Sequence, residues 1–213
     1  LRVEAALTCG TDLKVYRRGY HARMLTPPCV FGHELAGIVT ETSGAAAADT
    51  GRAWQVGDRV VAANSAPCGE CFSCRHQQEN LCDDLLFLNG AYASSIVIPA
   101  RLAARNLIPL RETTSFVDAA LTEPLACVVQ GIEDLQLKPG ERVLVLGGGP
   151  IGLMFVALAR DLGCSVSLAG RGAGRLALAS RLGASRIFDV AAEPDLLRAV
   201  PPGQHDVVVE AVG

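Results

Sequence analysis

The feature that most restricts the fold of this chain is a group of closely spaced cysteines. Cys68, Cys71, Cys74 and Cys82 fall within one short segment, and the first three are separated by two-residue gaps. Zinc prefers four thiolates at about 2.3 Å, and such gaps let one turn of backbone deliver successive sulfurs to the same ion. We therefore predict a closed structural zinc site that holds a loop and performs no chemistry. Disulfides of a secreted domain, or unrelated buried thiols, are the alternatives.

Composition limits the class of protein. Half of the 213 residues are apolar, which is enough for one large or two small domains. The 19 Lys+Arg against 22 Asp+Glu, without a basic stripe beside the cysteines, argue against a nucleic acid partner. No stretch approaches eighteen uncharged apolar residues, so we expect no membrane span and a cytoplasmic protein. Outside the group, Cys29, Cys127 and Cys164 are expected to be small buried hydrophobes.

The chain has two halves with different patterns, and we place the domains at 1–112 and 113–213. The first half has short apolar stretches broken by Gly, Pro and polar turns, which predicts an irregular β-domain. These stretches are residues 31–40, 56–62 and 91–98. The Ala-rich segment 43–51 lies between two of them and is expected to be an exposed, mobile loop.

The second half alternates helix and strand, which is typical of an α/β fold with a parallel sheet. Ser115 with Asp118 predicts one helix start, and Pro124 in the first turn of a segment from residue 122 predicts another. The predicted strands are 142–146, 165–169 and 206–210, and the predicted helices are 151–162 and 174–182. Residue 1 is Leu, and the sequence stops directly after the last strand, so we expect a fragment truncated at both ends.

A glycine motif lies between the strand 142–146 and the helix after it, as dinucleotide binding requires. The first glycine permits a tight turn, the second lets the backbone approach a pyrophosphate, and the third lets the helix pack closely. The N–H groups at the helix start face the anion. The predicted cofactor-binding residues here are Gly147, Gly149, Pro150, Ile151 and Gly152.

The end of the next strand predicts which dinucleotide binds. An acidic residue about 20 residues after the motif usually accepts hydrogen bonds from the adenosine ribose. Gly170 occupies that position, and Arg171 and Arg175 follow it. Without a carboxylate, a 2′-phosphate escapes repulsion and can form charge-assisted bonds to these arginines. We predict a preference for NADP over NAD; two solvated arginines beside a loop glycine are the alternative.

With its cysteine group and its glycine motif, the chain resembles the zinc-dependent medium-chain alcohol and sorbitol-type polyol dehydrogenases over essentially its whole length. The segments that carry the resemblance, in the family's order, are 9–12 (CGTD), 32–34 (GHE), 56–60 (VGDRV), the four cysteines, 123–126 (EPLA) and 147–152 (GGGPIG). The resemblance implies a GroES-like catalytic domain, a partial Rossmann domain, and an active site in the cleft between them. It also implies that the full-length protein is a homo-oligomer.

The resemblance also assigns a second, catalytic zinc, which gives two zinc ions per chain. Cys9 and His33 are its implied ligands, and Glu34, Glu123 or both in alternation complete the site. Zinc accepts such a mixed set and keeps one position open for water or substrate.

Two further implied residues surround that site. Thr11 matches the hydroxyl that accepts the alcohol proton, and Asp12 matches a carboxylate that orients the histidine ligand. Lys14 replaces the histidine that often ends the proton path, which leaves the end of the relay open.

The predicted activity is reversible oxidation of a secondary alcohol or polyol to a ketone, with hydride passing to NADP or NAD. The zinc-free quinone reductase branch of the same superfamily is one alternative, and the cysteine group argues against it. A truncated zinc- and nucleotide-binding remnant without turnover is another, because a Rossmann sheet typically has six strands and about four can be read here. The pocket residues are scattered, so the sequence does not identify the alcohol.

Overall fold

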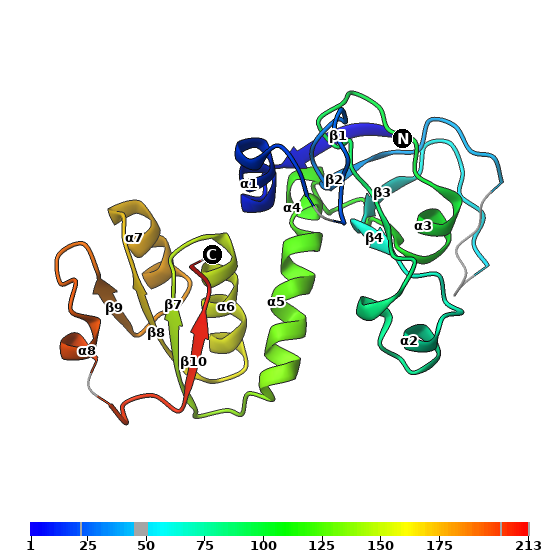
Figure 1. Cartoon of the computed structure of the whole chain (residues 1–213). Helices are drawn as coiled ribbons and strands as arrows, with labels where there is room; N and C mark the ends of the chain where they lie inside the picture. Colours follow the sequence, from blue (N-terminus) through cyan, green and yellow to red (C-terminus); the bar gives the residue numbers. More distant parts are fainter. Residues whose placement is uncertain (22, 45–50, 201, 213) are drawn as a thin grey trace. The chain divides into compact units, whose positions relative to one another are not determined.

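The computed structural model describes residues 1–21, 23–44, 51–200 and 202–212, apart from the side chain of residue 197. The predicted loop 43–51 lies largely outside these residues. The chain divides into two compact units, Leu1–Glu123 and Pro124–Gly213, drawn in blue to green and in green to red in Figure 1. Each unit is described by itself.

The first unit is built around an antiparallel sheet in the order β1-β2-β3-β6. Its strands are β1 (Arg2–Leu7), β2 (Glu34–Ile38), β3 (Arg59–Ala62) and β6 (Leu107–Pro109). A smaller sheet pairs β4 (Ser65–Ala66) with β5 (Leu86–Phe87). Buried Leu35, Val60 and Leu102 lie at the centre of its main core. The predicted irregular β-domain is confirmed.

Two of the three predicted apolar stretches contain strands. The third does not, so the prediction of a strand there was wrong. Residues 91–98 form no strand of their own, and Ser95 makes only an isolated bridge to Arg2. The backbone there makes only scattered bonds: Ala91 donates to Gly32 O at 3.0 Å, Ser94 O accepts the Val3 N–H of β1 at 3.0 Å, and Ile96 donates to Leu1 O at 2.9 Å. Apolar alternation alone could not distinguish this packed loop from a strand.

The helices of the first unit are short. They are α1 (Gly10–Arg18), α2 (Phe72–Arg75), the 3₁₀ turn η1 (Glu79–Leu81), α3 (Ala100–Arg105) and α4 (Phe116–Ala120). Ser115 caps α4 by accepting the Asp118 N–H at 3.0 Å, which confirms the predicted start. Buried Ala119 and Ala120 of α4 pack with Ala36 and Val61 of the sheet. The structure therefore keeps α4 with the first unit, whereas the sequence placed the boundary after residue 112.

The second unit contains a parallel sheet in the order β10-β7-β8-β9. Its strands are β7 (Arg142–Leu146), β8 (Ser165–Gly170), β9 (Arg186–Asp189) and β10 (Val207–Glu210). The helices are α5 (Thr122–Leu135), which starts in the first unit, α6 (Pro150–Asp161), α7 (Ala173–Arg181) and α8 (Leu196–Ala199). Val143, Val145, Val166 and Leu168 are at most 1% exposed and form the core with α6 and α7. The predicted βαβ alternation is confirmed, whereas β9 and α8 were missed.

Two further expectations concern membrane spans and the burial of single cysteines. Among the described residues, no helix combines the length and apolarity that crossing a bilayer requires. Cys164 is buried as expected, but Cys29 and Cys127 are exposed, so that expectation was wrong for both. Their positions, in a loop and on α5, leave the side chains open to solvent.

Candidate functional site

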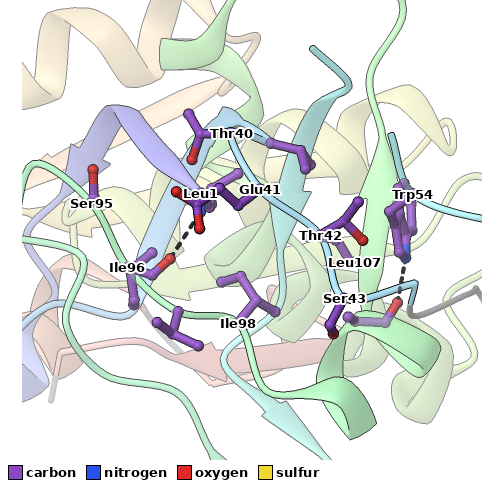
Figure 2. Close-up of a pocket in the computed structure, with 13 residues that line it drawn as sticks. Leu1, Thr40, Glu41, Thr42, Ser43, Trp54, Ser95, Ile96, Ile98 and Leu107 are labelled. Atoms are coloured by element: carbon purple, nitrogen blue, oxygen red, sulfur yellow. Dashed lines mark hydrogen bonds between the residues drawn. The ribbon is translucent and has the colours of Figure 1, made fainter. Parts of the chain in front are cut away.

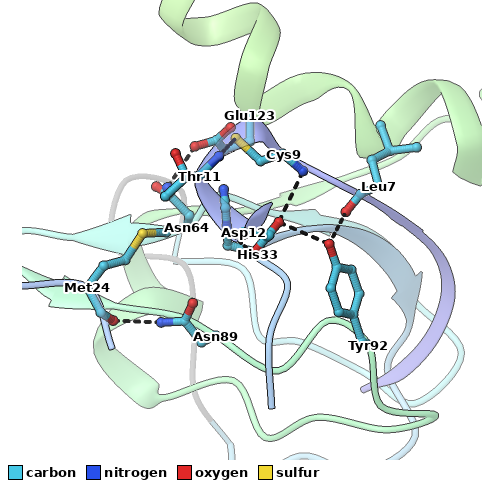
Figure 3. Close-up of polar contacts among 10 residues, drawn as sticks. All are labelled: Leu7, Cys9, Thr11, Asp12, Met24, His33, Asn64, Asn89, Tyr92 and Glu123. Carbon is cyan, nitrogen blue, oxygen red and sulfur yellow. Dashed lines mark hydrogen bonds and ion pairs between the residues drawn. The ribbon is translucent and has the colours of Figure 1, made fainter. Parts of the chain in front are cut away.

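The start of α1 positions Cys9. Cys9 is the N-cap residue, and its backbone N–H donates to Asp12 Oδ2 at 3.0 Å. In return, the Thr11 N–H donates to Cys9 Sγ at 3.4 Å. This reciprocal capping box is a thiol version of the usual arrangement with serine or threonine. It fixes the sulfur at the first turn of the helix and draws the Asp12 carboxylate beneath it (Figure 3).

His33 lies directly before β2 and is only 3% exposed. Its Nδ1 atom lies 3.4 Å from Asp12 Oδ1 and makes no hydrogen bond within the described residues. A nitrogen of the ring also lies within 4.8 Å of the Cys9 sulfur. A buried imidazole between a thiol and a carboxylate matches the arrangement in which one nitrogen binds a metal and the other faces a carboxylate.

The structure brings three of the four predicted catalytic-zinc ligands together. One sulfur, nitrogen or oxygen atom each from Cys9, His33 and Glu34 lies within 4.8 Å of the others. Ligand atoms at 2.0–2.3 Å from a tetrahedral ion are about 3.3–3.8 Å apart, so a small closure of this group fits zinc. A thiolate, an imidazole and a carboxylate form a set that zinc binds while keeping a position open.

Glu123 lies nearby but is held by a different partner. The Asn64 amide donates to Glu123 Oε1 at 2.6 Å, and Figure 3 shows both side chains beside Thr11 and Cys9. Glu123 does not belong to the group of atoms within 4.8 Å, although its charge acts on His33. The geometry therefore favours Glu34 over Glu123 as the third donor.

The pKa shifts at this site follow from burial and from the closeness of its charged and hydrogen-bonding groups. The hydrogen bond with His33 is the main cause that lowers the pKa of the Cys9 thiol. Burial alone would lower the pKa of His33, but the bond with Cys9 and the charge of Asp12 raise it overall. Burial raises the pKa of Glu34, as does the nearby charge of Glu123. A cation would offset this concentration of buried negative charge.

Two residues of the site were missed by the sequence analysis. Tyr92 donates toward Asp12 Oδ2 at 2.9 Å, and Asn64 holds Glu123. Neither lies within a motif that carried the resemblance, and both come from distant segments that only the fold brings to the site. Lys14, at the expected end of the proton path, is exposed on α1.

The four remaining cysteine ligands also converge. Sulfurs of Cys68, Cys71, Cys74 and Cys82 lie within 4.8 Å of one another. The Cys68 and Cys74 sulfurs are 3.9 Å apart, far beyond a disulfide bond of about 2.05 Å. Tetrahedral thiolates at about 2.3 Å from zinc are about 3.8 Å apart, so the spacing fits a closed zinc site.

The environments of these thiols differ. Backbone N–H groups, first that of Asp83, lower the pKa of Cys71 to about 6, whereas desolvation raises that of Cys74 to about 12. A metal would keep all four deprotonated.

Helix α3 supports the loop that carries these cysteines. Arg101 donates to Asp84 O at 2.7 Å and pairs with its carboxylate at 2.9 Å. One turn later, the Arg105 guanidinium lies directly over Gly69, where a side chain would collide with it. Because Leu102 of α3 is fully buried, the helix provides a rigid support for both limbs of the loop.

The glycine turn of the second unit has the predicted geometry. Gly147 has φ +115°, a conformation that favours glycine, and a Cβ on Gly152 would collide with Gly147 O. A Cβ on Gly149 would meet nothing within 4 Å, so the turn is open at that point. Pro150 and Ile151 then begin α6, whose N-cap has no side-chain hydrogen bond. Pro150 has no N–H, so the groups available to an anion are the unpaired N–H groups that follow it in the first turn.

A cavity of about 480 Å³ adjoins this turn. Gly170, Arg171 and Arg175 line it together with the three consecutive glycines. A Cβ on Gly170 would lie 3.0 Å from Gly148 N, which makes the end of β8 crowded as well as uncharged. Of the predicted cofactor residues, Gly147, Gly149, Gly170, Arg171 and Arg175 therefore line one cavity, whereas Pro150, Ile151 and Gly152 do not line it.

A second cavity, of about 550 Å³, lies in the first unit (Figure 2). Its lining includes Thr40, Trp54, Ile96 and Ile98, and the Trp54 indole donates to Ala103 O at 2.8 Å. None of the predicted site residues lines this cavity.

Comparison with known proteins gives matches to both sequence and structure. The alcohol dehydrogenase GroES-like domain matches residues 1–110. D-arabitol-phosphate dehydrogenase from Enterococcus avium is 36% identical over 202 residues, covering 90% of this chain and 53% of that protein. Sorbitol dehydrogenase from Bacillus subtilis (strain 168) is 31% identical over 213 residues, covering 97% and 58%.

Among solved structures, a candidate zinc-binding dehydrogenase from Sinorhizobium meliloti 1021, bound to NADP, has a TM-score of 0.87 and 34% identity. It matches the whole chain, which covers 61% of that structure. The chain thus spans between half and two thirds of the length of these relatives. With its GroES-like unit and its partial Rossmann unit, the chain belongs to the zinc-dependent medium-chain dehydrogenase family.

Proposed function

We propose that the full-length protein is a zinc-dependent oxidoreductase that transfers a hydride between a secondary alcohol or polyol and NAD(P). The observation that carries this proposal is the convergence of buried Cys9, His33 and Glu34, with Asp12 behind the imidazole. Such a mixed, open donor set is typical of a catalytic rather than a structural site. The dinucleotide cavity of the second unit supports the hydride acceptor.

Each residue has a role in this proposal. Cys9, His33 and Glu34 hold the ion, and Asp12 fixes the orientation of the imidazole. Bound zinc supplies Lewis-acid chemistry, which lowers the pKa of a hydroxyl group beside it. Thr11 would accept the proton that leaves the alcohol and hand on its own hydroxyl proton.

Glu123 is held by Asn64. In this proposal its negative charge acts on His33, or its carboxylate binds the ion in alternation with Glu34. Bound NADP or NAD would supply the hydride acceptor, and the protein contributes position and electrostatics.

Metal content is the first test. The two groups of candidate ligands predict two zinc ions per chain, measured by elemental analysis of the purified protein. One ion would favour a structural remnant without turnover, and none would favour the zinc-free reductase branch. Either of these results would contradict the proposed catalytic site.

The substrate class rests on the relatives. Those reported above are named for sorbitol and for arabitol phosphate, and both names describe polyols. We therefore propose a polyol or another secondary alcohol, to be tested by assaying the full-length protein with NADP against a panel of alcohols and polyols. Oxidation of none of the panel would count against the proposal.

We propose that NADP is preferred over NAD, and Arg175 offers a sharp test. We expect Arg175→Gln to lower kcat/KM for NADP by at least about 10-fold, because a charge-assisted hydrogen bond contributes about 1.5–3 kcal/mol. The value for NAD should change less than about two-fold, since the ribose hydroxyl carries no charge.

Arg181→Gln is the matched control, because Arg181 is exposed on the same helix and does not line the cavity. A wild-type preference for NAD, or equal losses with both cofactors, would contradict the assignment.

A further inference from the structure

The buried carboxylate of Asp12 requires hydrogen-bond donors on all sides. Asp12 is 5% exposed, and leaving a buried carboxylate oxygen without a donor is costly. Its Oδ2 atom accepts the Cys9 N–H at 3.0 Å and the Tyr92 hydroxyl at 2.9 Å, while Oδ1 faces His33 (Figure 3). Asp12 is therefore held by the N-cap residue of its own helix and by one residue of a distant loop, Tyr92.

The Tyr92 hydroxyl has one hydrogen, and both Leu7 O and Asp12 Oδ2 lie within hydrogen-bond distance of it, with the Thr8 side chain also nearby. Leu7 O lies 3.2 Å away, farther than Asp12 Oδ2. A charged acceptor gives the stronger bond, so the hydroxyl donates mainly to Asp12. Burial raises the pKa of Tyr92, as does the neighbouring Asp12, so the phenol remains protonated and a donor at neutral pH.

The ring of Tyr92 also contacts the backbone that carries His33. A Cβ on Gly32 would lie 2.7 Å from the ring, so the ring occupies the space where residue 32 would have a side chain. Gly32 itself has φ +91°, and the Tyr92 N–H donates to Phe31 O at 3.1 Å. Tyr92 therefore packs against the backbone immediately before His33. It also bonds to the Asp12 carboxylate, which faces the imidazole ring of His33.

We propose that Tyr92 is a positioning residue for the metal site, which acts on His33 through Asp12. The hydroxyl fixes the rotation of the carboxylate, and the carboxylate fixes the rotation of the imidazole. This inference rests on the proposed Cys9–His33–Glu34 site, but it does not depend on the identity of the alcohol or of the cofactor.

The test is the rate at which zinc leaves each site of the purified protein in the presence of excess dipicolinic acid. Loss of the same kinetic phase in Cys9→Ser identifies release from the Cys9 site. We expect Tyr92→Phe to accelerate that phase by about 10-fold, because partners of metal ligands contribute about 10–100-fold to metal affinity. Tyr16→Phe is the matched control, since Tyr16 is 78% exposed on α1, and it should leave the phase unchanged.

The pathway through Asp12 is tested by a double-mutant cycle. If Tyr92 acts through Asp12, then adding Tyr92→Phe to Asp12→Asn should change the rate by less than about two-fold. A full effect of Tyr92→Phe in that background would overturn the pathway, as would an unchanged rate in the single variant. The phase from the four-cysteine site should stay constant, which shows that each variant is folded.

Failure of this inference can be distinguished from failure of the proposed function. Absence of a Cys9-dependent phase in the wild-type protein would refute the metal site and the proposed function with it. A Cys9-dependent phase that is insensitive to Tyr92 would refute only the role of Tyr92. A sensitive phase in a protein that oxidises no alcohol would support Tyr92 and refute the proposed reaction.

Discussion

Replacing Cys9 with Ser is expected to lower kcat/KM of the full-length protein by at least about 10³-fold, because losing the ion at this site removes transition-state stabilisation of about 4 kcal/mol. Cys9 provides the only sulfur among the three donors Cys9, His33 and Glu34. Serine preserves the size of the side chain and its capping position, but a neutral hydroxyl is a poor zinc ligand. The measurement is steady-state kinetics on an alcohol that the wild-type protein oxidises, together with zinc content.

The variant should bind NADP with a Kd within about two-fold of wild type, because the glycine turn lies in the other unit and binds through its own backbone. Zinc content should fall by one ion per chain. Turnover close to the wild-type rate would refute the catalytic assignment of Cys9. Loss of both ions together would instead show that the substitution disrupts the whole unit.

The second large effect is expected at the four-cysteine site, where Cys82→Ser should destabilise the first unit. Cys82 is fully buried, and its sulfur accepts the Cys68 N–H at 3.2 Å. Structural zinc contributes about 10–16 kcal/mol to the folding of small zinc domains. If about 4 kcal/mol of this is lost, Tm should fall by about 8–16 °C for a chain of this size. Differential scanning calorimetry measures the change.

Cys29→Ser is the matched control, because Cys29 is exposed and lies outside both groups of candidate ligands. It should leave Tm and zinc content unchanged. Cys82→Ser should lose one zinc ion and yet retain the Cys9-dependent phase of zinc release at temperatures below its transition. An unchanged Tm with one ion lost would mean that the loop is held by protein contacts alone.

Much of the fold could be predicted from local patterns. β7 begins and ends where its short apolar run placed it, and the Ser115 cap marks the start of α4. These features depend on neighbouring residues, which the sequence shows directly. The strand β9 was missed because it is only four residues long, and both of its ends, Arg186 and Asp189, are polar and exposed.

In the candidate site, only the residues that lie within sequence motifs could be predicted. Cys9, His33 and the four clustered cysteines lie in short segments whose spacing or order is informative. The sequence left open which glutamate joins them, because that depends on how the starts of β2 and α5 are placed, which carry Glu34 and Glu123. Tyr92 and Asn64 were missed for the same reason, since contacts between residues 80 or 59 positions apart leave no local pattern.

The contacts between α3 and the loop that carries the four cysteines affect how that loop binds zinc again after the ion is lost. Arg101 and Arg105 reach Asp84 and Gly69, near its two ends, from a helix anchored in the core. The entropic cost of closing a loop is largest when the two ends of the loop can move apart freely. Here Arg101 bonds to the loop near one end and Arg105 lies against it near the other, so we expect a chain that has lost its zinc to sample fewer loop conformations before its thiols bind an ion again.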